Sequence, residues 1–200
     1  MNIFDVLIIL AFIFGVGFCM YVGMFRQSLS LLNIWLSLLF SLWLARPIGM
    51  TLIKAFLYME EEYTLETYGF VLSLATLITI GEIIIALLMA PEGQRLGESA
   101  GMDIHEVIDN IEAEDNKELW DLPSFVMGIF TTLIWLGVGL STFKYLLLAL
   151  PEYSALSSLQ YYFPRAGLMP MLSFIFKGVL FTVKFLVPSR LPGLLGYIFS

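Results

Sequence analysis

The sequence predicts an all-α integral membrane protein: a four-helix transmembrane bundle with an acidic amphipathic connector and a C-terminal interfacial helix. Hydrophobic residues make up 59% of the 200 positions and charged residues only 14%, with a mean hydropathy of +0.88. A soluble domain of this size needs more charge to cover its surface. Several apolar runs also reach the roughly 20 residues that a helix needs to cross a bilayer. The lipid bilayer is therefore the first expected partner of a single membrane domain, residues 1–200.

Four spans follow from the apolar runs, at residues 4–24, 28–45, 68–90 and 124–150. The first has no charge after Asp5 and no small-residue cleavage site behind it, which favours a retained helix over a signal peptide. A tight turn containing Arg26 and Gln27 is expected to join it to the second. We expect the second span to end at Arg46 and Pro47, because proline disfavours the helical conformation of the residue before it.

A strongly acidic connector, residues 91–122, separates the third and fourth spans. It holds ten acidic side chains against two basic ones, and the rest of the chain is nearly neutral. No basic surface is left that could attract a nucleic acid. Four apolar residues between Ile104 and Ile111 recur at helical spacing, so a short amphipathic helix is expected to rest on the membrane or on a partner.

A C-terminal apolar helix is expected at residues 169–187, after a shorter apolar piece at 48–59 that follows the second span. Ser173, Lys177 and Lys184 fall near one line on the C-terminal helix. A narrow polar stripe on an apolar helix favours an interfacial helix whose lysines reach the headgroups. A fifth span, which would have to bury or snorkel both lysines, is the alternative.

Small and polar residues recur every four positions on three of the predicted spans. Helices in lipid associate through close backbone approach and interhelical hydrogen bonds, so such stripes indicate helix–helix seams. The expected packing residues are Gly15, Cys19, Gly23, Asn33, Ser37, Ser41, Ser124, Gly128 and Thr132. Asn33 should face protein, because an unpaired amide facing lipid costs several kcal/mol.

Glu82 and Lys144 are ionisable residues within the third and fourth spans. A charge at the centre of a span costs about 2.5 to 3.5 kcal/mol on insertion scales, and such residues often line ion or proton paths. Alternatively, the Glu82 carboxyl is kept neutral by burial, snorkels, or pairs with Lys144. Lys144 is also close enough to the end of its span to extend to the interface.

Catalytic and metal-binding groups are sparse. The one histidine, His105, lies in the acidic connector, and the one cysteine, Cys19, lies in the first span. The sequence offers no nucleophile that can be matched with a histidine and an acid, no metal-ligand cluster and no phosphate-binding glycine loop. We therefore expect neither an enzyme nor a cofactor.

Several residues and short segments, taken together, match the pattern of one known family. They are Asn2, Asp5, Gly15, Gly23 with residues 24–27, Pro47, Gly128 and residues 168–175. Together they resemble the colicin V production protein family (CvpA-like), small bacterial inner-membrane proteins with four predicted spans. Where that family usually carries an arginine-glycine pair, this chain has Thr131 and Thr132. The resemblance implies a multi-pass inner-membrane accessory protein, linked to toxin production or export and envelope physiology through other membrane proteins or self-association.

The alternative function is a small oligomeric channel or transporter with Glu82 and Asn33 along a polar path. Membrane orientation is open between two indications. Lysine and arginine near the short connections favour a cytoplasmic N-terminus. The resemblance implies instead that the arginine-bearing first turn is cytoplasmic.

Overall fold

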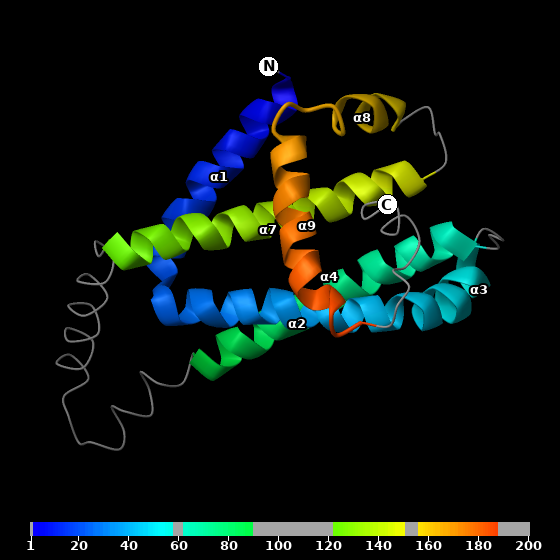
Figure 1. Cartoon of the computed structure of the whole chain (residues 1–200), viewed down its shortest axis with the longest axis horizontal. Helices are drawn as coiled ribbons and strands as arrows, with labels where there is room; N and C mark the ends of the chain where they lie inside the picture. Colours follow the sequence, from blue (N-terminus) through cyan, green and yellow to red (C-terminus); the bar gives the residue numbers. More distant parts are fainter. Residues whose placement is uncertain (1, 58–61, 90–121, 151–155, 188–200) are drawn as a thin grey trace.

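The computed structural model describes residues 2–57, 62–89, 122–150 and 156–187, and their regular elements are all helical (Figure 1). Within these ranges four helices are long and apolar enough to cross a membrane, at Ile3–Val22, Met24–Ile53, Thr64–Leu87 and Leu122–Ala149. The predicted all-α membrane bundle is confirmed. The acidic connector predicted at 91–122 lies outside the described residues, except for Leu122, which begins a helix.

Helices α1 (Ile3–Val22) and α2 (Met24–Ile48) are joined by Gly23 alone. Gly23 has φ 80°, a conformation that glycine adopts without steric cost, so one residue is enough to interrupt the helix and turn the chain. The predicted turn containing Arg26 and Gln27 is therefore wrong: both residues lie in the first turn of α2.

Pro47 does not end the second span, contrary to the prediction. The helix continues from α2 through the π-helix η1 (Gly49–Ile53) into α3 (Lys54–Leu57). Proline lacks an N–H group and its ring crowds the preceding turn, and the helix accommodates this by widening. The amide of Gly49 donates to both Ala45 and Arg46, so the backbone stays bonded across the proline. The piece predicted at 48–59 thus belongs in part to the second span.

Helix α4 (Glu62–Met89) packs antiparallel along α2. A side chain at Gly69 would overlap the backbone of Ala45, and one at Gly49 would overlap that of Leu65, so glycines set the spacing of the two helices. Ser73 lies buried in the same seam. The sequence analysis marked the α2 side of this seam and missed the glycines of α4.

Helix α7 (Leu122–Ala149) packs against α1, which diverges from α2 with distance from Gly23 (Figure 1). A Cβ at Gly15 would lie 2.5 Å from Thr132 Cγ2, and one at Gly128 would lie 3.4 Å from Cys19 Cβ. Gly15 and Cys19 of α1 thus face Gly128 and Thr132 of α7. The two stripes read from the sequence meet each other here.

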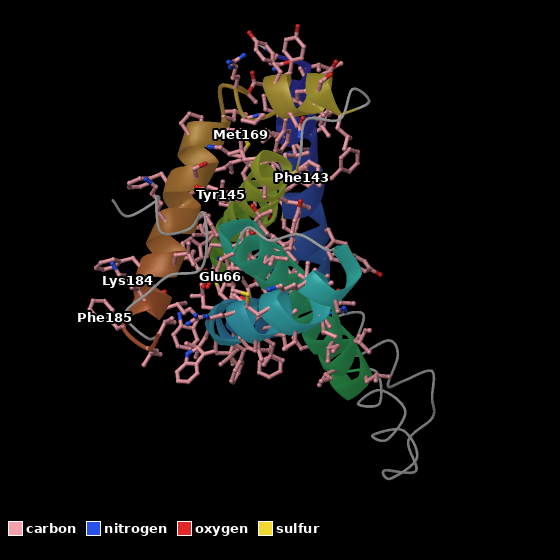
Figure 2. The ribbon with its side chains drawn as sticks, turned by 90° about the vertical axis from the view of Figure 1, so that its right-hand side faces the viewer. Glu66, Phe143, Tyr145, Met169, Lys184 and Phe185 are labelled. Carbon is pink, nitrogen blue, oxygen red and sulfur yellow. The ribbon has the colours of Figure 1, made fainter. Side chains whose placement is uncertain are left out.

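After α8 (Ser157–Tyr162), helix α9 (Met169–Lys184) crosses α7 and α2 (Figure 1). Its apolar face is buried, and a Cβ at Gly137 near the middle of α7 would lie 2.9 Å from Ile175. Trp35 of α2 donates to Thr182 at 3.1 Å. Lys184 and Phe185 at its far end point away from the bundle (Figure 2).

The length of α9 argues against a fifth span, the alternative drawn from the sequence. Sixteen residues span only about 24 Å, short of a fifth span. The interfacial position stays a prediction: the apolar face of α9 packs across α7 near Gly137, and its far end lies beside Trp35 of α2. Asp5 anchors its start: Oδ1 accepts from the Leu168 amide at 3.0 Å, and Oδ2 accepts from the Asn2 amide at 2.8 Å.

Candidate intramembrane binding site

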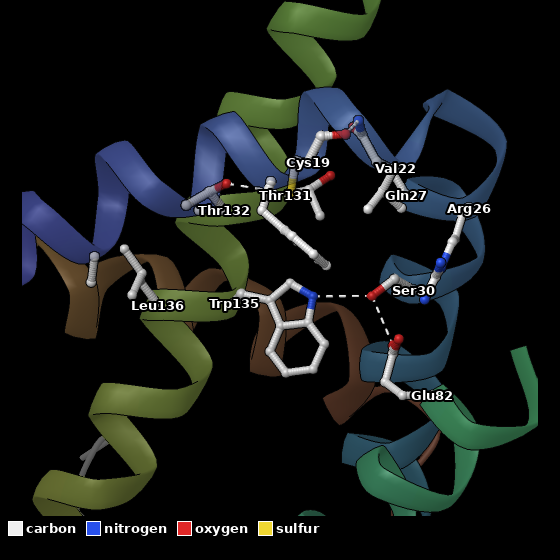
Figure 3. Close-up of a pocket in the computed structure, with 13 residues that line it drawn as sticks. Cys19, Val22, Arg26, Gln27, Ser30, Glu82, Thr131, Thr132, Trp135 and Leu136 are labelled. Carbon is white, nitrogen blue, oxygen red and sulfur yellow. Dashed lines mark hydrogen bonds between the residues drawn. The ribbon is translucent and has the colours of Figure 1, made fainter. Parts of the chain in front are cut away.

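Glu82 lies about two helical turns before the end of α4, with its side chain turned towards α2. Its Oε1 accepts a hydrogen bond from Ser30 Oγ at 2.8 Å (Figure 3), and it accepts a second from Asn33 Nδ2 at 3.1 Å. No described residue donates to Oε2, and none forms an ion pair with the carboxylate. Two neutral donors on α2 therefore hold one oxygen of Glu82 and leave the other available.

Asn33 is bonded on every side by protein, as expected of an amide inside a span. Its Nδ2 also donates to the carbonyl of Ile78 at 3.1 Å, and its Oδ1 accepts from Ser37 Oγ at 3.3 Å. A side chain at Gly81 would overlap the amide of Asn33. The glycine next to Glu82 therefore makes room for the amide that orients the carboxylate.

Trp135 of α7 extends this network to a third helix. Its Nε1 donates to Ser30 Oγ at 3.0 Å, and Ser30 in turn donates to Glu82 (Figure 3). The Ser30 hydroxyl is buried between the two and uses its donor and an acceptor position at once. The indole, the hydroxyl and the carboxylate thus tie α7, α2 and α4 together at one point.

A cavity of about 240 Å³ opens beside this network, between α1, α2, α4 and α7. Its volume corresponds to roughly eight water molecules at about 30 Å³ each. Its polar wall consists of Arg26, Gln27, Ser30, Glu82, Thr131, Thr132 and Trp135. The remainder of the wall is apolar and comes mainly from α1, so the cavity suits a small ligand with both polar and apolar parts.

Two fully buried side chains in this wall have unused hydrogen-bonding capacity. Gln27 and Thr131 are each 1% exposed. Gln27 Nε2 donates to the carbonyl of Cys19, whereas Gln27 Oε1 and Thr131 Oγ1 have no partner among the described residues. Buried polar groups are normally paired, and leaving one unpaired costs about 1 to 3 kcal/mol. Both oxygens are closed off from the cavity in this conformation, so a ligand would reach them only after these side chains rotate.

The floor of the cavity is the seam between α1 and α7. Thr132 Oγ1 donates to Cys19 Sγ at 3.5 Å, and Gly15 lies against Thr132. Gly128 of the same seam is buried one turn away. Of the other expected packing residues, Gly23 forms the α1–α2 turn, and Ser37, Ser41 and Ser124 are buried. The Ser41 carbonyl accepts from Ser73 of α4.

Lys144 does not take part in this site. It lies near the far end of α7, half-buried, with Nζ 5.9 Å from the centre of the Tyr145 ring. The pairing of Glu82 with Lys144, one of the alternatives drawn from the sequence, is absent from the described ion pairs. The described residues also contain no cluster of three histidine, cysteine or acidic side chains that could hold a metal ion.

Sequence reasoning identified Glu82 and Asn33 but missed the groups around them. Ser30 lies three residues before Asn33 and seven before Ser37, so helical spacing could have placed all three on one face. Trp135 carried no comparable signal, because its partner is on another helix. Comparison with protein-family models, curated proteins and solved structures finds no match to this chain. The resemblance to the colicin V production family stays a prediction.

Proposed function

We propose that this protein is a small membrane transporter or channel in which Glu82 binds a proton or a cation at the cavity between α1, α2, α4 and α7. The observation that supports this is the Glu82 carboxylate itself. It lies inside a span beside a cavity, is oriented through Oε1 by Ser30 and Asn33, and keeps Oε2 unbonded among the described groups.

The energetics favour a binding role for this carboxylate. An ionisable group in a transmembrane segment is costly and usually faces protein or a water-filled space on a transport path. A purely structural carboxylate would be expected to have its charge compensated, and the two hydrogen bonds to Glu82 come from uncharged donors. In this proposal Asn33 positions Glu82 through its hydrogen bond to Oε1. It does not line the transport path, since it is not part of the cavity wall.

Flux measurements in proteoliposomes test the proposal. With a potassium diffusion potential and a pH-sensitive dye inside the vesicles, the protein should carry protons, or sodium or potassium ions in parallel assays. Glu82→Gln keeps the shape and removes the charge, and should reduce flux on the order of tenfold. Glu62→Gln, an exposed carboxylate at the other end of α4, is the matched control. Equal flux through the wild type and Glu82→Gln would refute the proposed role.

The second candidate is an accessory protein of the colicin V production type in the bacterial inner membrane. The segments around Gly23, Pro47 and residues 168–175 favour it. Such a protein would act through partner proteins in toxin export or envelope physiology. Isolation from native membranes should then recover a stable complex. Recovery of a lone species from several detergents, with export and envelope stress unchanged on deletion, would exclude this role.

A further inference from the structure

We propose that the cavity binds a small zwitterion, with its ammonium group at Glu82 and its anionic group at Arg26. This inference rests on the proposed function, because both place a cation at Glu82. It adds a second, oppositely charged contact and thereby names the class of ligand.

Arg26 is the second charged side chain of the cavity wall (Figure 3). It lies on α2 one turn before Ser30, so the two residues share a helix face with Cβ atoms about 5 to 6 Å apart. In the described part of the chain Arg26 forms no ion pair, and its guanidinium does not reach within 4.0 Å of the Glu82 carboxylate. Opposite charges therefore line one small cavity without contact.

The network around Glu82 explains this separation. Ser30 and Asn33 hold the carboxylate towards α2 by Oε1. The guanidinium of Arg26 has five N–H donors, and its planar fork fits a carboxylate or phosphate. A ligand that brings a cation to one group and an anion to the other would complete both contacts at once.

The unpartnered neutral groups fit an ammonium ion as well. An ammonium group has three N–H donors, more than Glu82 Oε2 alone can accept. Gln27 Oε1 and Thr131 Oγ1 belong to residues of the same wall, have no partner among the described residues, and would become further acceptors on α2 and α7 if their side chains rotated towards the ligand. A bare metal ion would leave Arg26 uncompensated, and a simple anion would be repelled by Glu82. The combination of groups favours a ligand that carries both charges.

Two sources can supply this chemistry. A free α-amino acid carries an ammonium and a carboxylate, and the cavity of about 240 Å³ leaves space for a small one. The headgroup of phosphatidylethanolamine carries an ammonium and a phosphate and reaches the protein from the bilayer. Both satisfy the same two contacts, so the test must separate them.

The experiment measures thermal stabilisation of the whole chain in phosphatidylcholine nanodiscs by three matched probes, since a bound ligand raises the unfolding temperature. The probes are alanine, ethylamine, which lacks the carboxylate, and propionate, which lacks the ammonium. Alanine should bind at least about tenfold more tightly than either. A parallel set of nanodiscs contains phosphatidylethanolamine, whose ammonium donates hydrogen bonds where the quaternary group of phosphatidylcholine cannot.

Two variants assign the contacts. Arg26→Gln should lower the affinity for alanine to that for ethylamine and leave ethylamine unchanged. Glu82→Gln should remove the advantage of alanine over propionate, and it should strengthen propionate binding because the carboxylate no longer repels an anion. Lys54→Gln, an exposed cation on α3 away from the cavity, should change none of these values.

The outcomes are distinct. Alanine binding that phosphatidylethanolamine does not weaken supports a free zwitterion, and stabilisation by phosphatidylethanolamine that excludes alanine supports the lipid headgroup. The inference is overturned if neither alanine nor phosphatidylethanolamine binds more tightly than ethylamine, or if Arg26→Gln has no effect on the binding of either zwitterion. Ion flux that depends on Glu82 would in that case leave the proposed function standing, whereas loss of both would remove both.

Discussion

The side-chain amide of Asn33 on α2 donates to Oε1 of Glu82 on α4 at 3.1 Å, and it donates equally to the carbonyl of Ile78 one turn before Glu82. One amide thus connects two helices and orients the carboxylate of the cavity. Interhelical hydrogen bonds of this kind contribute about 0.6 kcal/mol on average in a membrane, and up to about 1.7 kcal/mol.

The Asn33–Glu82 contact should be measurable as a coupling free energy. In a double-mutant cycle of Asn33→Ala and Glu82→Ala, which removes the donor and the acceptor in turn, the free energies of unfolding should deviate from additivity by about 0.6 to 1.7 kcal/mol. Equilibrium unfolding in mixed micelles is the measurement. The control cycle pairs Asn33→Ala with Glu62→Gln, which should be additive within about 0.3 to 0.5 kcal/mol. Additivity in both cycles would contradict the bond.

Gly81→Ala should impair the site more than the fold. The added methyl group would displace the amide of Asn33, which is a side chain and can turn aside, but only by giving up its bond to Glu82. We expect flux that depends on Glu82 to fall while the protein stays folded. Gly17→Ala is the control, because a Cβ there meets nothing within 4 Å. Undiminished flux in Gly81→Ala would argue against positioning by Asn33.

Gly69→Ala should instead destabilise the fold. Its Cβ would overlap the backbone carbonyl of Ala45, and a backbone carbonyl cannot turn aside without moving α2. Overpacking of this kind costs about 1 to 3 kcal/mol. Thermal unfolding should show the loss, whereas Gly139→Ala, which has open space around its Cβ, should be neutral or slightly stabilising. Equal stability of the two variants would mean that this seam is not closely packed.

Thr132→Cys should form a disulfide with Cys19. The present hydroxyl lies 3.5 Å from the Cys19 sulfur, and Cys19 is the one cysteine of the chain, so the pairing is unambiguous. Under mild oxidation both thiols should become protected from maleimide labelling, and reductant should restore them. Gly139→Cys, exposed two turns further along α7, should leave both thiols reactive within one chain. Equal protection in the two variants would contradict the α1–α7 arrangement.

The spans could be predicted and their ends could not. Each span follows from local hydropathy, whereas Pro47 was expected to stop α2 and instead lies within a continuous helix whose next turn widens. The rule that proline ends a helix considers only the local backbone. The turn after Pro47 is also held by a tertiary contact, the packing of Gly49 against Leu65 of α4, which the rule does not include. Prediction from sequence is limited in the same way for α9. The lysine stripe shows which face of the helix is polar, but it does not show which helices pack against the apolar face.

The sequence by itself determined that this chain is an all-α membrane protein with four spans and an ionisable residue inside the third, since apolar length and the position of a charge depend on the order of residues alone. Only the tertiary structure decided that Glu82 meets Ser30 and Asn33, that Lys144 lies elsewhere, and that Arg26 shares its cavity. Those contacts depend on how each helix is rotated and where it crosses its neighbours. The rotation of each helix and the place where it crosses its neighbours are set by contacts between side chains that are far apart in the sequence.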